Sequence, residues 1–170
     1  MESQNKKIHQ LVMAAVFAAA ITVTTAYVLH IPIPTGGYLH LGDTLIYLGA
    51  CLLPLPWAMG AAAVGAALAD LLTAPMWALA TFLIKALMCL PFARKSKKLL
   101  CGRNIAAVVI AGVGESVLYS FVNAFFMASM AGFLPQFIGT MIQATASGVL
   151  FLVIAAAVDK VGLKDRLPGV

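Results

Sequence analysis

The amino-acid sequence predicts an all-α integral membrane protein: one domain over residues 1–170, built as a six-transmembrane-helix bundle with a long first extracellular loop. Composition predicts this class. Hydrophobic residues make up 62% of the 170 residues and charged residues only 10%, whereas about a quarter of a soluble domain is usually charged. Mean hydropathy is +1.00, and the length accommodates about six helices of roughly 20 residues with short connections.

Six apolar stretches, separated by prolines, glycines or charges, place the spans at about 9–30, 42–53, 57–73, 75–93, 104–129 and 134–158. The first follows Lys6 and Lys7, but it is longer than the 7–15 apolar residues of a cleaved signal, so we expect a retained helix. The second is short and is closed by "PLP" at 54–56. We therefore expect it to be tilted or to have its ends shielded by protein.

Basic residues predict the orientation of the bundle. With six spans, ten of the eleven lysines and arginines fall on one side: Lys6, Lys7, Arg94, Lys95, Lys97, Lys98, Arg103, Lys160, Lys164 and Arg166. The positive-inside rule then places both termini in the cytoplasm and residues 31–41 outside. Topology explains the net charge of +5, and nucleic-acid binding is not needed to account for it.

Motifs for catalysis or cofactor binding are missing from the sequence. It contains no GxxxxGK[ST], HExxH or GxSxG pattern, and Cys51, Cys89 and Cys101 form no CxxC pair. We therefore expect no metal, no cofactor and no enzymatic activity. We expect the thiols to be buried or to face lipid.

Small residues recur at helical spacing on the first span. Ala14 and Ala18 lie four residues apart, as do Ala15 and Ala19, and such pairs allow two helix backbones to approach closely. Two interpretations remain open: packing within this bundle, or a surface that docks a second membrane protein.

Four ionisable residues lie within or at the edge of the spans: Asp43, Asp70, Lys85 and Glu115. Each costs about 2.5–3.5 kcal/mol at a helix centre, so each requires a partner or water. Lys85 and Glu115 fall near the midplane of consecutive antiparallel spans, which predicts an ion pair, either a structural clamp or the floor of a ligand pocket. Asp43 is interpreted as a helix N-cap, and Asp70 as either a solvated carboxylate or a pocket residue.

Polar and aromatic side chains form one stripe on each of the last three spans, at three- or four-residue spacing: Trp77, Thr81 and Lys85; Glu115, Tyr119 and Asn123; Gln136, Thr140, Gln143 and Ser147. Because polar stripes that face lipid are costly, we expect them to face one another. No stripe continues to the cytoplasmic side. The pattern predicts an outward-opening, dead-end cavity that binds a solute without conducting it.

The segments IPIPTGGYLHLGD (31–43), LPLPWAMGAAAVGAALADLLTAP (53–75) and ATFLIKAL (80–87) resemble the substrate-binding S components of energy-coupling factor (ECF) vitamin transporters. The resemblance is to their riboflavin-transporter-like branch, within it most of all to the vitamin B6 and hydroxymethylpyrimidine S components. It implies capture of a water-soluble vitamin from outside, closure of the first loop, association with a membrane scaffold (T) subunit and two cytosolic ATPases, and release by toppling. It also implies docking through Ala14, Ala15, Ala18 and Ala19.

The residues expected to contact the substrate are Gly36, Gly37, Tyr38, His40, Asp43, Trp77, Thr81, Lys85, Glu115, Tyr119, Asn123 and Gln143. Rings, amides and a Lys/Glu pair suit a small flat heteroaromatic with hydroxyl and ring-nitrogen groups. Two alternatives stay open at this point: an autonomous secondary transporter or channel, which requires a continuous pathway, and a small membrane enzyme, which requires a nucleophile and a base.

Overall fold

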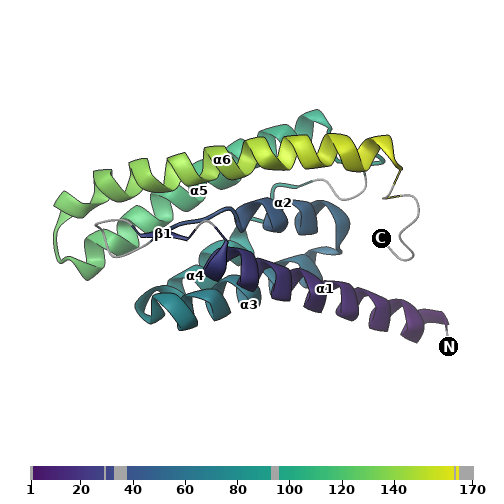
Figure 1. Ribbon diagram of the computed structural model, residues 1–170, viewed down its shortest axis with the longest axis horizontal. Helices are drawn as coiled ribbons and strands as arrows, with labels where there is room; N and C mark the ends of the chain where they lie inside the picture. The colour runs from purple at the N-terminus through teal and green to yellow at the C-terminus, as the bar shows by residue number, and fades with distance from the viewer. Residues whose placement is uncertain (1, 29, 33–37, 93–95, 163, 165–170) are drawn as a thin grey trace.

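The computed structural model describes residues 2–28, 30–32, 38–92, 96–162 and 164 (Figure 1). Helices contain 81% of these described residues, which confirms the all-α class. Within the described ranges there are six α-helices: α1 (Glu2–Tyr27), α2 (Asp43–Leu52), α3 (Leu55–Thr73), α4 (Ala78–Leu87), α5 (Gly102–Phe126) and α6 (Phe133–Lys160). Two 3-10 turns, η1 (Pro75–Trp77) and η2 (Met130–Gly132), precede α4 and α6.

Four helices, α1, α3, α5 and α6, are long and apolar enough to cross a membrane. α2 and α4 have ten residues each, or about 15 Å at a rise of 1.5 Å per residue, which is half of a hydrocarbon core of ~30 Å. Four candidate spans are therefore observed, and six crossings stay a prediction.

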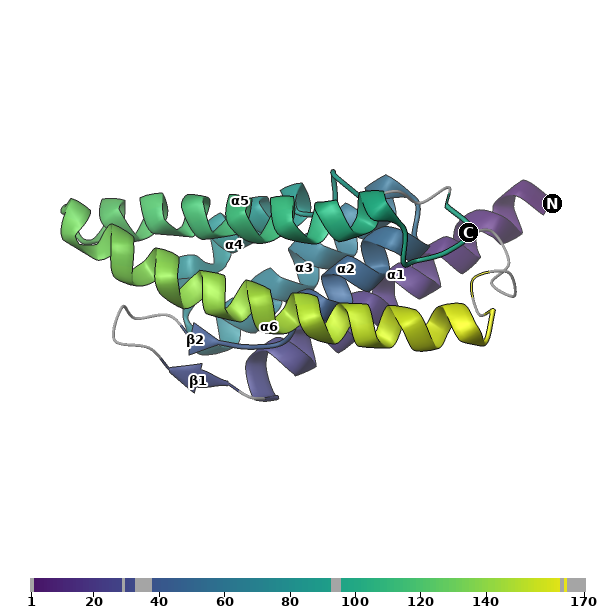
Figure 2. The same cartoon turned by 90° about the horizontal axis from the view of Figure 1, so that it is seen from above.

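The first loop contains a short antiparallel ribbon. β1 (Ile31–Pro32) pairs with β2 (Tyr38–Leu39), with Ile31 opposite Leu39 and Pro32 opposite Tyr38. The ribbon lies at one end of the bundle, and the start of α1 and the end of α6 lie at the other (Figures 1 and 2). We call these the ribbon end and the terminal end.

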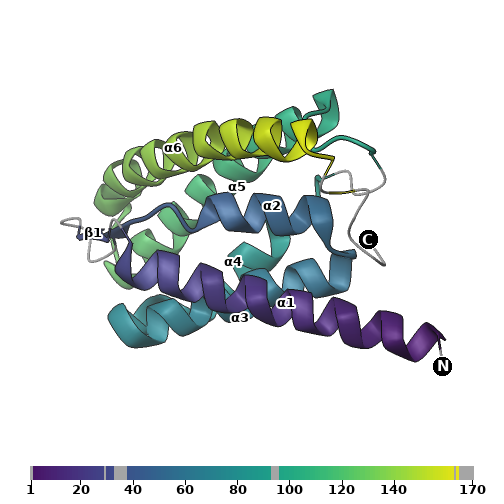
Figure 3. The same ribbon diagram turned by 45° about the vertical axis from the view of Figure 1, so that its right-hand side comes forward.

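α2 occupies the centre of the bundle. It lies between the α5–α6 pair and the α1–α3 pair (Figure 3) and contacts α1, α3 and α6. Nine of its ten residues are buried, all but Leu45. Protein therefore surrounds this short helix, in agreement with the shielding expected from its length.

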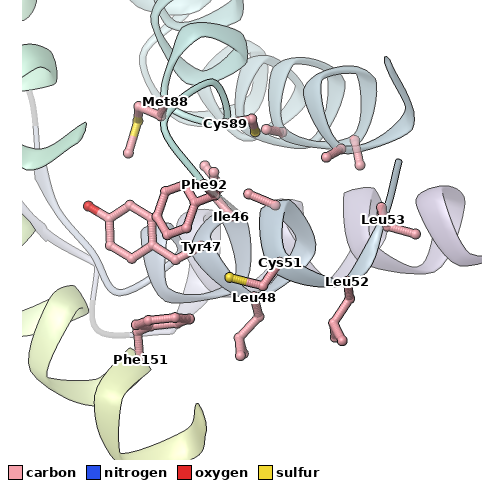
Figure 4. Packing of buried hydrophobic residues seen from close by; sticks show 14 of the residues in the cluster. Ile46, Tyr47, Leu48, Cys51, Leu52, Leu53, Met88, Cys89, Phe92 and Phe151 are labelled. Carbon is pink, nitrogen blue, oxygen red and sulfur yellow. The ribbon is translucent and has the colours of Figure 1, made fainter. Parts of the chain in front are cut away.

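The interior on the terminal side of the bundle is apolar. Tyr47 of α2 stacks on Phe92 with ring centroids 5.4 Å apart, and Phe151 of α6 meets both rings edge-on at 5.9 and 6.2 Å (Figure 4). All three side chains are at most 2% exposed. The outer surface is also apolar: Leu79 and Phe125 are 76% and 81% exposed, as expected for side chains that face lipid.

The small residues of α1 divide into two groups. Ala14 is buried, and Ala18 is half-buried against α3, where a Cβ on Gly65 would lie 2.6 Å from the Ala18 carbonyl oxygen. Ala15 and Ala19 are exposed. The first pair therefore packs within the bundle, which is one of the two interpretations left open, and the second pair is exposed to a partner. Docking through this helix stays a prediction.

Candidate functional site

The polar stripes of α4, α5 and α6 face the interior, as expected from their spacing. Every member is buried: Trp77, Thr81, Lys85, Glu115, Tyr119, Asn123, Gln136, Thr140, Gln143 and Ser147. The residues between the members of each stripe are apolar and face lipid or the core, which favours a helix with one polar side. The stripes therefore bring side chains from three helices together inside the bundle.

An ionic network lies at the centre of this polar region. The Lys85 Nζ donates to Glu115 Oε2 at 2.7 Å, which confirms the predicted pair, and to Asp43 Oδ1 at 2.5 Å. Gln143 Nε2 donates to Asp43 Oδ2 at 2.7 Å. Side chains from α2, α4, α5 and α6 are thus joined, and each charge has a partner, as burial requires.

The role expected for Asp43 as a helix N-cap is wrong. Gly42 occupies the N-cap position of α2, and no side chain caps the helix. The Asp43 carboxylate points inward to Lys85 instead. Burying Lys85 between helices needs more than one acceptor, and Asp43 supplies the second.

His40 precedes α2 in a buried position. Its Nδ1 accepts a hydrogen bond from the Gly42 backbone N–H at 3.1 Å, so the ring proton resides on Nε2. Burial lowers the pKa of His40 to about 4, in opposition to the nearby Asp43 carboxylate, which raises it. The imidazole is therefore neutral at physiological pH.

A cavity lies between the ionic network and the β1–β2 ribbon. Its lining residues come from β2, α3, η1, α4, α5 and α6: Tyr38, Leu39, His40, Asp70, Trp77, Thr81, Tyr119, Gln136, Thr140 and Gln143. The cavity has a volume of about 40 Å³, which is room for about three water molecules.

Aromatic side chains and a hydroxyl connect the cavity to the network below it. The rings of Trp77 and Tyr119 are 5.9 Å apart, and the Tyr119 hydroxyl donates to Thr81 Oγ1 at 2.8 Å. The Lys85 ammonium lies 5.4 Å from the centroid of the Tyr119 ring, within cation–π range. Tyr119 therefore has one face toward the charges and its hydroxyl at the cavity wall.

The ribbon closes one side of the cavity through a hydrogen bond from the Tyr38 hydroxyl to Asp70 Oδ1. Tyr38 also stacks on His30, with ring centroids 3.9 Å apart. Burial and the charge of Asp70 raise the pKa of Tyr38 well above its usual value, so the hydroxyl keeps its proton and acts as the donor.

Two buried polar atoms at the cavity wall have no partner among the described residues: the Trp77 indole Nε1 and the Gln136 side-chain Oε1. Gln136 Nε2 is used, because it donates to Thr140 Oγ1 at 3.1 Å. A buried donor or acceptor without a partner costs about 1–3 kcal/mol. The wall therefore offers one donor and one acceptor to a molecule within the cavity.

The sequence pattern of a family described as "ECF-type riboflavin transporter, S component" matches residues 5–160, almost the whole helical bundle. The chain belongs to this family. S components are membrane subunits that bind the substrate of an ECF transporter and pair with a T scaffold and ATPases. The chain is also 37% identical over 134 residues to a Pyrococcus woesei protein described as an uncharacterized protein in the gap 3′ region, with 77% of this chain and 88% of that protein covered.

The cavity of this S component includes about half of the side chains expected from the sequence to contact substrate: Tyr38, His40, Trp77, Thr81, Tyr119 and Gln143. Asp43, Lys85 and Glu115 do not line it. They form the network beyond Tyr119 and Gln143. Of the two interpretations of the Lys85–Glu115 pair, this position favours the structural clamp over the cavity floor. Gly36 and Gly37 lie outside the described residues.

Asn123 does not line the cavity either. Its amide donates to the Gly132 carbonyl at 2.9 Å, so it holds the turn between α5 and α6. Leu39, Asp70, Gln136 and Thr140 line the cavity but were not among the expected contacts. The α6 stripe predicts Gln136 and Thr140 at the cavity, and a pocket position is one of the two interpretations of Asp70, so of these four residues Leu39 alone carries no signal in the sequence.

No described residues form a group of three or more His, Cys, Asp or Glu side chains arranged to hold a metal ion. The two carboxylates that converge at the centre of the bundle share the Lys85 ammonium instead. The polar region is therefore arranged for hydrogen bonding and ring contacts.

Proposed function

We propose that this S component captures a small, flat, water-soluble heteroaromatic vitamin or precursor from outside the cell, similar to vitamin B6 or hydroxymethylpyrimidine. It delivers this substrate by toppling in the membrane together with the T scaffold and two cytosolic ATPases. The protein resides in the plasma membrane of a prokaryote with both termini in the cytoplasm.

The observation that carries the proposal is the chemistry of the cavity wall. The Trp77 and Tyr119 rings offer flat contact surfaces, and the Trp77 Nε1 and Gln136 Oε1 are buried without partners. A ring that carries nitrogen and hydroxyl groups can stack on the aromatic faces and satisfy both atoms.

Entry of such a molecule requires the wall to move. A cavity of about 40 Å³ is much smaller than the ~300 Å³ at the lower end for ligand pockets. The ribbon is the element that can withdraw, because few contacts of its described residues hold it in place. The Tyr38 hydroxyl bonds to Asp70 and to Thr73 on α3, and the Tyr38 ring packs against His30 and His40. Displacement of Tyr38 from Asp70 would open the cavity from the ribbon end.

The packed interior supports capture rather than conduction. Beyond the ionic network, the rings of Tyr47, Phe92 and Phe151 fill the centre of the bundle. A solute that reached the cavity would meet this apolar cluster. Release on the other side therefore requires movement of the whole subunit, which agrees with toppling by an ECF module.

Docking to the scaffold is assigned to the exposed pair on α1. Ala15 and Ala19 are exposed and lie one helical turn apart, so a partner helix can approach the α1 backbone closely there.

Native mass spectrometry of the purified chain, followed by thermal shifts with riboflavin, pyridoxine and 4-amino-5-hydroxymethyl-2-methylpyrimidine, tests the proposal. We expect one of these heteroaromatics to be retained or to raise the melting temperature. Stabilisation by none of them would contradict the proposal.

The two tryptophans supply a matched control for the location of binding. Trp77 lines the cavity, whereas Trp57, near the start of α3 at the terminal end, packs against the apolar core. Trp77→Leu should weaken binding of the stabilising compound at least about tenfold, because a ring contact and a hydrogen bond are lost. Trp57→Leu should leave the affinity unchanged, and equal effects of the two would contradict this location.

A further inference from the structure

The cavity wall is acidic. Asp70, near the end of α3, is 5% exposed and lines the cavity. No lysine or arginine lines it among the described residues, and the lining histidine, His40, is neutral because burial lowers its pKa to about 4. The wall therefore has a carboxylate and no cation to balance it.

The direct ion pairs of the buried lysine are with carboxylates other than Asp70. The Lys85 ammonium is held between Asp43 and Glu115 at 2.5 and 2.7 Å and is 1% exposed. It does not line the cavity. Two carboxylates already surround this single ammonium, so it is not available to an anionic group in the cavity.

The amide donors near the cavity are also engaged. Gln143 Nε2 donates to the Asp43 carboxylate, which fixes the orientation of the amide because a carboxylate only accepts. Gln136 Nε2 donates to Thr140, while its Oε1 has no partner. The wall thus offers acceptors on Asp70 and Gln136 and only neutral donors, among them the Trp77 Nε1.

The carboxylate of Asp70 has a donor that a ligand can replace. Tyr38 donates to Asp70 Oδ1 from β2, an element with few contacts to the helices. The hydroxyl keeps its proton because burial and Asp70 raise the pKa of Tyr38. When the ribbon withdraws, Asp70 keeps its hydrogen bond with the Thr81 hydroxyl but loses the Tyr38 donor, and this acceptor position then becomes open to a donor of the ligand.

We propose that Asp70 selects the substrate by charge: it accepts a hydrogen bond from an amino, ring N–H or protonated ring nitrogen of the ligand in place of the Tyr38 hydroxyl. The site therefore takes neutral or cationic heteroaromatics and rejects those that carry a carboxylate or phosphate. This inference rests on the proposed function and specifies its substrate class.

Selection by charge is tested with three compounds that share one ring and differ at one substituent. This substituent is neutral in pyridoxine, cationic in pyridoxamine and anionic in 4-pyridoxate. A second pair, 4-amino-5-hydroxymethyl-2-methylpyrimidine and its monophosphate, extends the test to pyrimidines. Affinities are measured by calorimetry on the full-length protein in detergent. We expect each anionic compound to bind at least about 100-fold more weakly than its neutral or cationic counterpart, because like charges brought together without water are strongly disfavoured.

Asp70→Asn separates charge from size. If charge is the cause, this variant should reduce the discrimination at least about tenfold, since an asparagine can donate to an anion. Discrimination that is unchanged in Asp70→Asn would overturn the assignment to Asp70. The wild-type series alone also decides the rule, so the test does not depend on the stability of the variant.

The outcomes distinguish the two proposals. Equal binding of the anionic and neutral compounds would overturn charge selection and leave the binding subunit intact. Binding of neither series, nor of any vitamin in the thermal-shift panel, would overturn the proposed function and charge selection with it.

Discussion

Replacement of Lys85 with methionine should destabilise the bundle strongly. The ammonium is 1% exposed and holds two carboxylates at 2.5 and 2.7 Å. Its removal leaves Asp43 and Glu115 buried without their cation, and breaking a buried ion pair in this way costs about 3–5 kcal/mol. For a chain of 170 residues, this corresponds to a fall in melting temperature of roughly 6–20 °C.

The assay is thermal unfolding of the purified protein in detergent at neutral pH, with Lys97→Met as the matched control. Lys97 is exposed, so its replacement should change the free energy of unfolding by less than about 0.5 kcal/mol. A triple variant that also carries Asp43→Asn and Glu115→Gln should recover most of the loss, because none of the three charges of the network then remains buried. A melting temperature of Lys85→Met within about 2 °C of the wild type corresponds to a loss of no more than about 1 kcal/mol and would refute the reasoning.

Three further predictions concern the ribbon end and α1. The free energy of unfolding should fall by up to about 3 kcal/mol as pH drops from about 6.5 to about 4. In this range His40 binds a proton in the unfolded chain but not in the folded protein, where its pKa is lowered to about 4. The melting temperature of His40→Gln should depend less on pH. Gly65→Ala should lower the free energy of unfolding by about 1–3 kcal/mol, because its Cβ would lie 2.6 Å from the Ala18 carbonyl oxygen. A Cβ on Gly60 meets nothing within 4 Å, so the control Gly60→Ala should not destabilise the protein. Equal melting temperatures of the two variants would contradict this packing. Ala15→Trp should abolish uptake in cells that contain the ECF module and leave ligand binding unchanged, and normal uptake would exclude this face as the docking surface.

The positions of the helices could be predicted from the sequence because lipid imposes a simple rule on each segment. Apolar stretches between prolines and charges located all six helices to within a few residues, apart from the early start of α1 at Glu2 and the short α4, which ends at Leu87. Hydropathy does not state whether a short apolar helix meets lipid or protein. The central place of α2 was therefore visible only in the structure.

The candidate site was predictable where one helix carries the information. Spacing along α4, α5 and α6 identified side chains that share a face, and opposite charge paired Lys85 with Glu115. The contribution of Asp43 depends on how α2 packs between other helices, and no local pattern reports that. The same holds for Ala14, which is buried, and Ala15, which is exposed. Both are alanines on one helix, and only the packing of α1 against its neighbours decides which of them is covered.

The central position of α2 has a consequence for how this protein is made. A helix of ten residues is too short to cross a hydrocarbon core of ~30 Å alone, and it carries Asp43, which is fully buried within the bundle. The partners that shield it, Lys85 on α4 and Gln143 on α6, leave the ribosome much later. We therefore expect the first third of the chain to lack a stable arrangement in lipid until α6 has been made, and we expect α2 to stay near the translocon during synthesis. Chains that end before α6 should be substrates for membrane proteases.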